Sequence, residues 1–199
     1  MEPIIETNMA LMFIFLLAVA WFFLHKYSEK PFEKLLKRAA AGNAQAQYDM
    51  GYMYYQGKQV EQNFSRAFNW FDTSAKQGHV RAMVALAGLY NEGKGCTQDP
   101  EKAFYCYEQA AQTGDFEARV NLAVCYLQGT GVEKNEEKGA ELLKAAADDK
   151  SPLAQTLLGD LYERGVGVGK SEKEAVRYYV MAAKQGEPLA KKKLEALKK

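Results

Sequence analysis

A single period of thirty-six residues governs the chain from residue 43 to residue 186 without a gap. Tyrosines, glycines and small residues return in register four times, and a fixed period of this length is typical of stacked repeat units. The register is marked by Tyr54, Tyr90, Tyr126 and Tyr162, by Gly57, Gly93, Gly129 and Gly165, and by Gly51, Ala87, Ala123 and Gly159. Four copies of one structural unit therefore fill this region.

Each unit is predicted to form two helices joined by a tight turn. In the third unit, the segment Glu117–Gln128 has apolar or small residues at helical spacing and stops at a glycine. Gly-x-Gly pairs then supply the backbone freedom that a tight turn needs. A residue able to cap the second helix follows each turn, namely Asn63, Asp99, Asn135 and Ser171. The fold class is therefore all-α.

A helix pair of this size cannot bury its own apolar face, so the units must stack on one another. We predict an α-solenoid of four 36-residue helix-turn-helix repeats over residues 43–186. A linker and a capping helix, a half repeat, occupy residues 26–42, and residues 187–199 form a lysine-rich capping helix. Its lysines suit the polar outer surface of a terminal unit, and a basic patch for membrane phosphates is the alternative.

The N-terminus carries a different signal, a run of sixteen apolar residues from Met9 to Leu24. Extended slightly at both ends, the run gives about 28 Å of helix at about 1.5 Å per residue, enough to span a bilayer. The alternative is a cleaved signal peptide, but the leader contains Glu2 and Glu6 and no basic residue. We therefore expect a short tail over residues 1–8 and a transmembrane helix over residues 9–25.

The flanks of this run predict its orientation. No Lys or Arg precedes it, whereas five follow it closely, and the basic side of a span tends to stay in the cytoplasm. The five are Lys26, Lys30, Lys34, Lys37 and Arg38. We expect a single-pass, inner-membrane protein with a cytoplasmic repeat domain, and a periplasmic domain is the alternative.

No residue pattern indicates catalysis, a metal or a cofactor. The loop over residues 165–171 resembles a phosphate-binding loop but lacks its first glycine and follows a helix rather than a strand. The three cysteines, Cys96, Cys106 and Cys125, form no metal-ligand set, which favours free thiols, although a Cys106–Cys125 bridge stays open for an oxidising compartment. A net charge of +1 gives no reason to expect nucleic acid as a partner.

Segments of the chain resemble a known family. The stretches LAGLYNEGKG, LAVCYLQGTGV and LGDLYERGVGV, each followed by a helix such as KAFYCYEQAA, are similar to SEL-one-like repeats, relatives of the tetratricopeptide repeat. The pattern departs at Gln59, Ser74 and Lys150, where the repeats elsewhere carry glycine or alanine. The resemblance implies a right-handed solenoid with a concave face that binds proteins, often in bacterial envelope and secretion assemblies.

Likeness to tetratricopeptide arrays also implies which residues line the inner face. First-helix positions between the core positions are expected to face a protein or peptide partner. They are Tyr48, Asp49, Tyr52, Tyr55, Arg81, Gly88, Asn91, Asn121, Gln128, Asp160 and Arg164. The tyrosines suit an interface anchor, and packing against the helix over residues 31–42 is the alternative. Asn121 matches a peptide-gripping position, but Ala85 stands there one repeat earlier, so a full carboxylate clamp is not expected.

These features favour a membrane-anchored, non-enzymatic adaptor or scaffold that recruits a protein or peptide to a membrane complex. Two alternatives stay open. One is a periplasmic-facing assembly or localisation factor of a bacterial secretion system or envelope machine. The other is a regulator of a cell-wall enzyme. No cofactor and no small-molecule substrate are expected.

Overall fold

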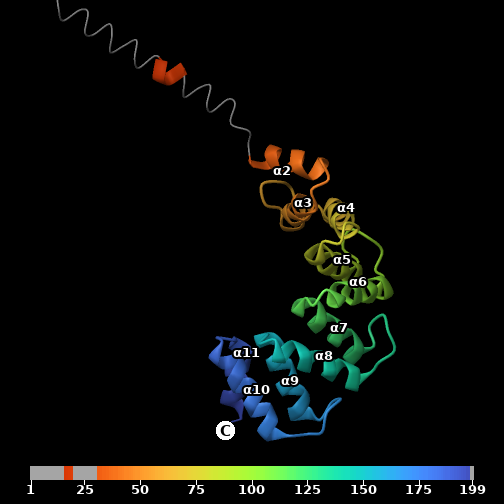
Figure 1. The fold of residues 1–199 in the computed structure, drawn as a ribbon, viewed down its shortest axis with the longest axis vertical. Coiled ribbons are helices and arrows are strands. Elements are labelled where there is room, and N and C mark those ends of the chain that lie inside the picture. The colour runs from red at the N-terminus through yellow and green to blue at the C-terminus, as the bar shows by residue number, and fades with distance from the viewer. Residues whose placement is uncertain (1–15, 20–30, 198–199) are drawn as a thin grey trace, which may run out of the picture.

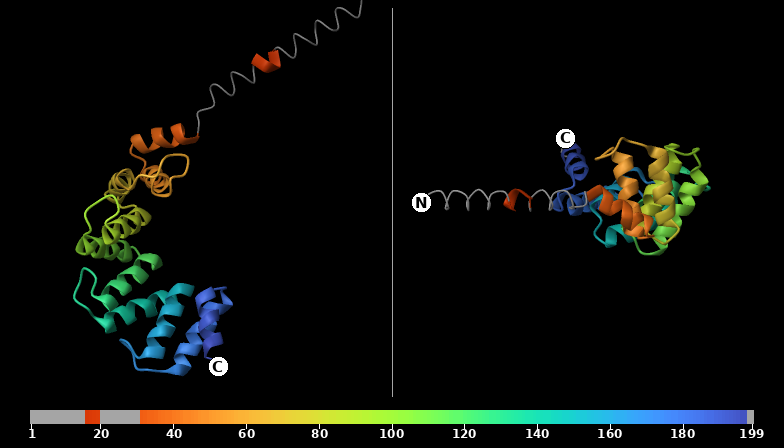
Figure 2. Two further views of the ribbon diagram at one scale, coloured as in Figure 1. Left: turned by 180° about the vertical axis from the view of Figure 1, so that it is seen from behind. Right: turned by 90° about the horizontal axis from the view of Figure 1, so that it is seen from above.

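The computed structural model describes residues 16–19 and 31–197, and within these ranges every regular element is a helix. The helices follow one another along a curved rod, each packed against its neighbours in sequence (Figures 1 and 2). Their bounds are α2 Pro31–Ala40, α3 Ala44–Gln56, α4 Phe64–Ala75, α5 Val80–Glu92, α6 Pro100–Gln112, α7 Phe116–Gln128, α8 Glu136–Asp148, α9 Pro152–Arg164, α10 Glu172–Lys184 and α11 Pro188–Ala196. This is the predicted array: α3, α5, α7 and α9 are first helices, and α4, α6, α8 and α10 are second helices. The right-handed sense of the array stays a prediction.

The predicted caps start the second helices. The side chains of Asn63, Asp99 and Asn135 each accept a hydrogen bond from the amide three residues later, at 2.9 to 3.0 Å. Ser171 does the same at 3.3 Å. The first helices are capped in the same way by Asn43, His79, Asp115 and Ser151. The capping predictions for the second helices are therefore confirmed, and His79 has a structural role.

The turn glycines are required by the backbone and by the second helix of the preceding repeat. Gly93 ends α5 with φ 66°, and a Cβ at Gly95 would collide with the backbone carbonyl of Phe64 at the start of α4. Gln59 occupies the matching place in the first repeat with φ 64°, a left-handed conformation that favours glycine.

Small residues in the first helices make room for large ones in the second helices. A Cβ added at Gly51 would lie 2.5 Å from the ring of Phe71, and one at Gly159 would lie 2.7 Å from the ring of Tyr179. Phe71 and Tyr179 are almost fully buried. The recurring small residues therefore set how closely the two helices of a repeat approach.

The recurring tyrosines lie between the helices under a basic side chain. Arg66 lies 5.4 Å from the ring centroid of Tyr54, and Lys138 lies 4.3 Å from that of Tyr126. Such contacts are stabilising because the face of an aromatic ring attracts a cation. The fourth repeat differs: Tyr162 stacks on the ring of Tyr178 at 5.7 Å.

In three of the repeats, a hydrogen bond or ion pair joins a side chain of the first helix to a side chain at the end of the second helix. The amide of Gln77 donates to Gln47, that of Gln185 donates to Gln155, and Arg119 pairs with Asp149 at 2.6 Å. Each interaction links residues that are thirty apart in the sequence. In the second repeat, Met83 stands at the register position of Gln47, and the described part of the chain shows no equivalent interaction there.

Two expectations concern the thiols and the membrane. Cys96, Cys106 and Cys125 are free, so the Cys106–Cys125 bridge is not formed.

Among residues 16–19 and 31–197, no helix has the length and apolarity to cross a membrane. The predicted span, residues 9–25, lies mostly outside the described residues.

Candidate partner-binding groove

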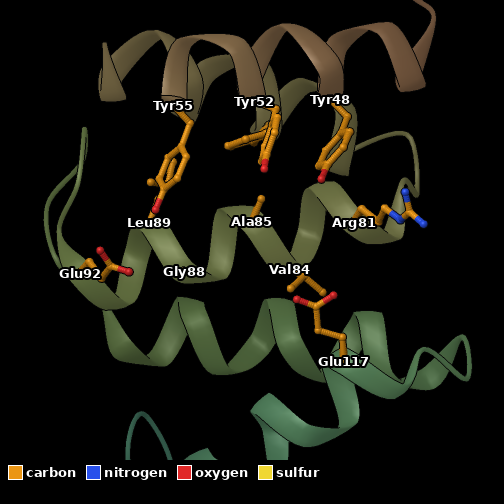
Figure 3. Close-up of a pocket in the computed structure, with 11 residues that line it drawn as sticks. Tyr48, Tyr52, Tyr55, Arg81, Val84, Ala85, Gly88, Leu89, Glu92 and Glu117 are labelled. Carbon is orange, nitrogen blue, oxygen red and sulfur yellow. The ribbon is translucent and has the colours of Figure 1, made fainter. Parts of the chain in front are cut away.

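Three tyrosines of α3 line an open groove against α5. Tyr48, Tyr52 and Tyr55 lie on one face of α3 and point towards α5, with Arg81 at one end (Figure 3). The groove has a volume of about 390 Å³ and takes further walls from Phe71, Val84, Leu89 and Glu92, and from Glu117 at the start of α7. We call it the tyrosine groove. It is therefore built mainly from the first helices of three consecutive repeats.

The tyrosines share a face because they are four and three residues apart, which is about one helical turn each. The ring of Tyr48 is held between Phe71, at 5.7 Å, and the imidazole of His79, at 5.0 Å and 27°. Tyr52 stacks on Tyr48 at 6.2 Å and is 45% exposed. Tyr55 packs against Phe64 edge to face. The inner ring is fixed, and the middle ring is available to a partner.

The floor of the groove is made of small residues. Ala85 and Gly88 lie beneath the tyrosines on α5 (Figure 3). A Cβ added at Gly88 would meet no atom within 4 Å. The space there is thus open, as a concave binding site requires.

Charged groups lie at both ends of the groove. Glu92 is paired with Lys94 at 2.5 Å near Tyr55. Within the described residues, Arg81 and Glu117 form no ion pair or side-chain hydrogen bond, and they lie near Tyr48. Burial raises the pKa of Tyr48, and the Arg81 guanidinium opposes that shift. One cation and one anion are therefore left to a ligand.

The remaining predicted site residues lie elsewhere. Asp49 lines a shallow pocket with Phe32 and Leu35 of α2, and it accepts a hydrogen bond from Gln45. Asn91 is half-buried, and its side-chain oxygen has no hydrogen-bond partner among the described residues. Neither residue lines the tyrosine groove.

A second pocket collects three predicted residues from the far end of the array. Gln128, Asp160 and Arg164 line a space of about 340 Å³ between α7 and α9. Asp160 is already engaged there, by Arg164 at 3.2 Å and by Lys193 of α11 at 2.5 Å. Asn121 lies on α7 and lines neither pocket.

Several residues that line the tyrosine groove were not predicted from the sequence, most notably Glu117. A signal was available, because Arg81 and Glu117 occupy the same register position in consecutive repeats and carry opposite charges. Residues at one register position lie on one face of a stacked array, so the sequence could have shown that opposite charges meet on this face. Tyr54, by contrast, belongs to the core side of α3, where it packs against the buried cluster of Ala39, Ala46 and Met50.

The fold and the groove together define an α-solenoid of the protein-interaction type. Residues 44–79, 80–115, 116–151 and 152–187 each match the Sel1 repeat. The chain belongs to the Sel1 repeat family. Within the described residues, no cluster of three or more His, Cys, Asp or Glu side chains could hold a metal ion.

Solved structures agree with this assignment. A Sel1 repeat protein from Oxalobacter formigenes is 30% identical over 83% of this chain and 66% of its own, with a TM-score of 0.79. A protective antigen of uropathogenic Escherichia coli, which displays an SLR fold, is 34% identical over 79% of this chain, with a TM-score of 0.75. The chain spans only 34% of that antigen. No curated protein matches the chain.

Proposed function

We propose that this protein is a membrane-anchored, non-enzymatic adaptor that holds a protein or peptide partner in the tyrosine groove. The single observation that carries the proposal is the open row of Tyr48, Tyr52 and Tyr55 beside Arg81 and Glu117, which have no ion-pair partner where the structure describes the chain. Tyrosine buries a large area at a small cost in side-chain entropy, which makes it a frequent interface anchor. Membership of a family built for protein interaction supports the same conclusion.

A photo-crosslinking residue at position 52 tests the groove in the native membrane. Tyr52 is replaced by p-benzoylphenylalanine, and crosslinked products are identified by mass spectrometry after irradiation. The matched control places the same residue at Glu141, which is exposed on the second helix α8. We expect a reproducible partner from position 52 and none from position 141. Absence of any reproducible product from position 52 would contradict the proposal.

The membrane tether is the second part of the proposal. The apolar run over residues 9–25 supports it, and the basic residues that follow favour a cytoplasmic side for the repeats. Alkaline phosphatase fused after Lys199 is expected to be inactive, because the enzyme folds only outside the cytoplasm. An active fusion would instead favour the periplasmic orientation. Release of the protein by carbonate washing would argue against the anchor itself.

A further inference from the structure

We propose that His79 is a positioning residue of the tyrosine groove and makes partner binding depend on pH: its neutral imidazole holds Tyr48 in place, and the imidazolium releases it. The inference rests on the proposed function, in which the tyrosine groove holds a partner. His79 is also the N-cap of α5, and the caps of the other first helices in the repeats are Asn43, Asp115 and Ser151. Among these four residue types, only histidine ordinarily changes its charge between about pH 5 and pH 8.

Both ring nitrogens of His79 have partners, and these partners define the neutral form. Nδ1 accepts a hydrogen bond from the Ala82 amide at 3.2 Å, so it carries no proton. Nε2 lies 3.0 Å from Oε1 of Gln45, which is an acceptor, so Nε2 carries the proton. The amide nitrogen of Gln45 donates to Asp49 at 2.8 Å, which directs the amide oxygen to His79. The neutral imidazole therefore links the start of α5 to α3, the helix that carries the tyrosines.

The same imidazole covers the ring of Tyr48. The ring centroids of His79 and Tyr48 lie 5.0 Å apart at 27°, and Phe71 contacts Tyr48 at 5.7 Å. Tyr52 stacks on Tyr48 at 6.2 Å, and both rings point into the groove (Figure 3). Burial raises the pKa of Tyr48, so this ring stays uncharged near neutral pH. Loss of the imidazole would therefore uncover Tyr48 and loosen the Tyr52 ring that stacks on it.

A second proton on the imidazole is incompatible with this arrangement. It turns Nδ1 into a donor, but the Ala82 amide that faces Nδ1 is a donor too. The start of α5 also carries partial positive charge, which repels a cation. The ring face of Tyr48 attracts a cation, but this attraction does not replace the lost acceptor. A flip of the ring in place would put carbon atoms against both Ala82 and Gln45. The imidazolium must therefore swing away from the start of α5, and Tyr48 loses its cover.

The groups around His79 set the pH at which this happens. Burial opposes the imidazolium most strongly, Arg81 of α5 opposes it as well, and Asp49 of α3 favours it. On α4, Asp72 and its neighbour Lys76 are paired with each other at 2.7 Å. The net result is that the pKa of His79 lies below its ordinary 6.5. The ordered groove is therefore complete above that value and is lost as pH falls through the lowered one.

Nuclear Overhauser contacts between the rings of His79 and Tyr48 test the release without any partner. The full chain is studied in detergent, and the imidazole protons report the protonation of His79 in the same samples. We expect the contacts at about pH 7.5 and their loss by about pH 5.5, with the same midpoint as the imidazole titration. Contacts between Tyr162 and Tyr178, which stack in the fourth repeat, should persist. Ring contacts that survive while the imidazole titrates would overturn the proposal.

Photo-crosslinking at position 52 tests the consequence for binding, in isolated membranes at the same two pH values. The matched control is His79→Asn, which keeps a cap of the kind that Asn43 provides and does not titrate. We expect about threefold less product at the lower pH with native His79, because a loosened site must be ordered on binding, and no pH dependence with His79→Asn. A yield that is independent of pH with native His79, or an equal fall in His79→Asn, would overturn the proposal. Absence of product at both pH values would contradict the proposed function instead, and the ring contacts would still decide whether His79 positions Tyr48.

Discussion

The two ends of the first-helix face use the same register positions in opposite ways. At the N-terminal end, Tyr52 and Tyr55 face an open groove. At the C-terminal end, the matching positions are Asp160 and Glu163, and both are bound by Lys193 of α11. The hydroxyl of Tyr179 also donates to Glu163, at 2.6 Å. The tyrosines of one end are therefore open to solvent, whereas the matching carboxylates of the other end are bound by the last helix of the chain.

This difference teaches that register alone does not identify a binding residue in a repeat protein. Asp160 and Arg164 lie on the same face of a first helix as the tyrosines do, yet their charges already form ion pairs within the chain. A charged group that already has an ion pair gains little from a new one, because the old pair must first be broken. The C-terminal closure should therefore contribute to stability, and the tyrosine groove to binding.

The largest expected effect tests whether both ends depend on the same close approach of the two helices of a repeat. Gly51→Ala and Gly159→Ala each place a methyl group against a buried ring, so each should lower the free energy of unfolding by about 2 kcal/mol. Gly88→Ala is the control: its site is open, and the loss of a helical glycine should stabilise by about 0.5 kcal/mol. Urea denaturation measures all three. Equal stability of all three variants would show that the close approach of the helices is not limiting.

The next largest effect separates the two ends by charge reversal. Lys193→Glu places an anion beside Asp160 and Glu163, and should cost about 1 to 2 kcal/mol and detach α11. Arg81→Glu reverses a charge that has no ion-pair partner among the described residues, so it should change stability by less than about 0.5 kcal/mol. Hydrogen exchange of the α11 amides and urea denaturation provide the measurements. If the two reversals cost the same, the proposed division of roles is wrong.

Acid should weaken the C-terminal closure selectively. Burial raises the pKa of Asp160, but its bonds from Lys193 and Arg164 outweigh this, and the Tyr179 and Lys193 bonds lower the pKa of Glu163. Since both folded values lie below the ordinary 3.8 and 4.5, the stabilisation is complete above those values and is lost as pH falls through the lowered ones. Exchange in α11 should rise below about pH 4, and Lys193→Ala should abolish this rise.

A comparable local strain is expected near each end. Lys150, which precedes the fourth repeat, has φ 65°, and Gln59 in the first repeat has φ 64°. A side chain in this left-handed region costs about 1 kcal/mol, so Lys150→Gly and Gln59→Gly should each raise stability by up to about that amount. Thermal unfolding measures the gain. A loss of stability in either variant would show that its side chain makes contacts which outweigh the strain.

The smallest effect belongs to the N-terminal end alone. Burial lowers the pKa of His79. Its Nδ1 accepts a hydrogen bond from the Ala82 amide at 3.2 Å, so the imidazole caps α5 only when Nδ1 carries no proton. Because the folded pKa lies below the ordinary 6.5, this stabilisation is complete above 6.5 and is lost as pH falls further. The loss should be about 0.5 kcal/mol. His79→Asn should flatten the pH dependence of Tm between about pH 5 and pH 7.

Much of the fold could be predicted because repeat positions report on one another. Asn63 and Asp99 cap their helices as the sequence indicates, and Gly51 lies at a close approach as its place among small residues suggests. The site was less accessible to prediction. Glu117 joins the tyrosine groove from the third repeat, and Lys193 reaches back to Asp160 across thirty-three residues. Such contacts between different repeats depend on how the units stack.

The sequence by itself determined the period, the caps, the turns and the helical class of this protein, because these depend on local backbone preferences and on periodic burial within one unit. The tertiary structure alone decided which face residues stay open, which charges the chain neutralises with its own cap, and that the imidazole of His79 covers the ring of Tyr48. These outcomes depend on side-chain volume and charge at the junctions between repeats. Neighbouring units meet there only after the array has formed.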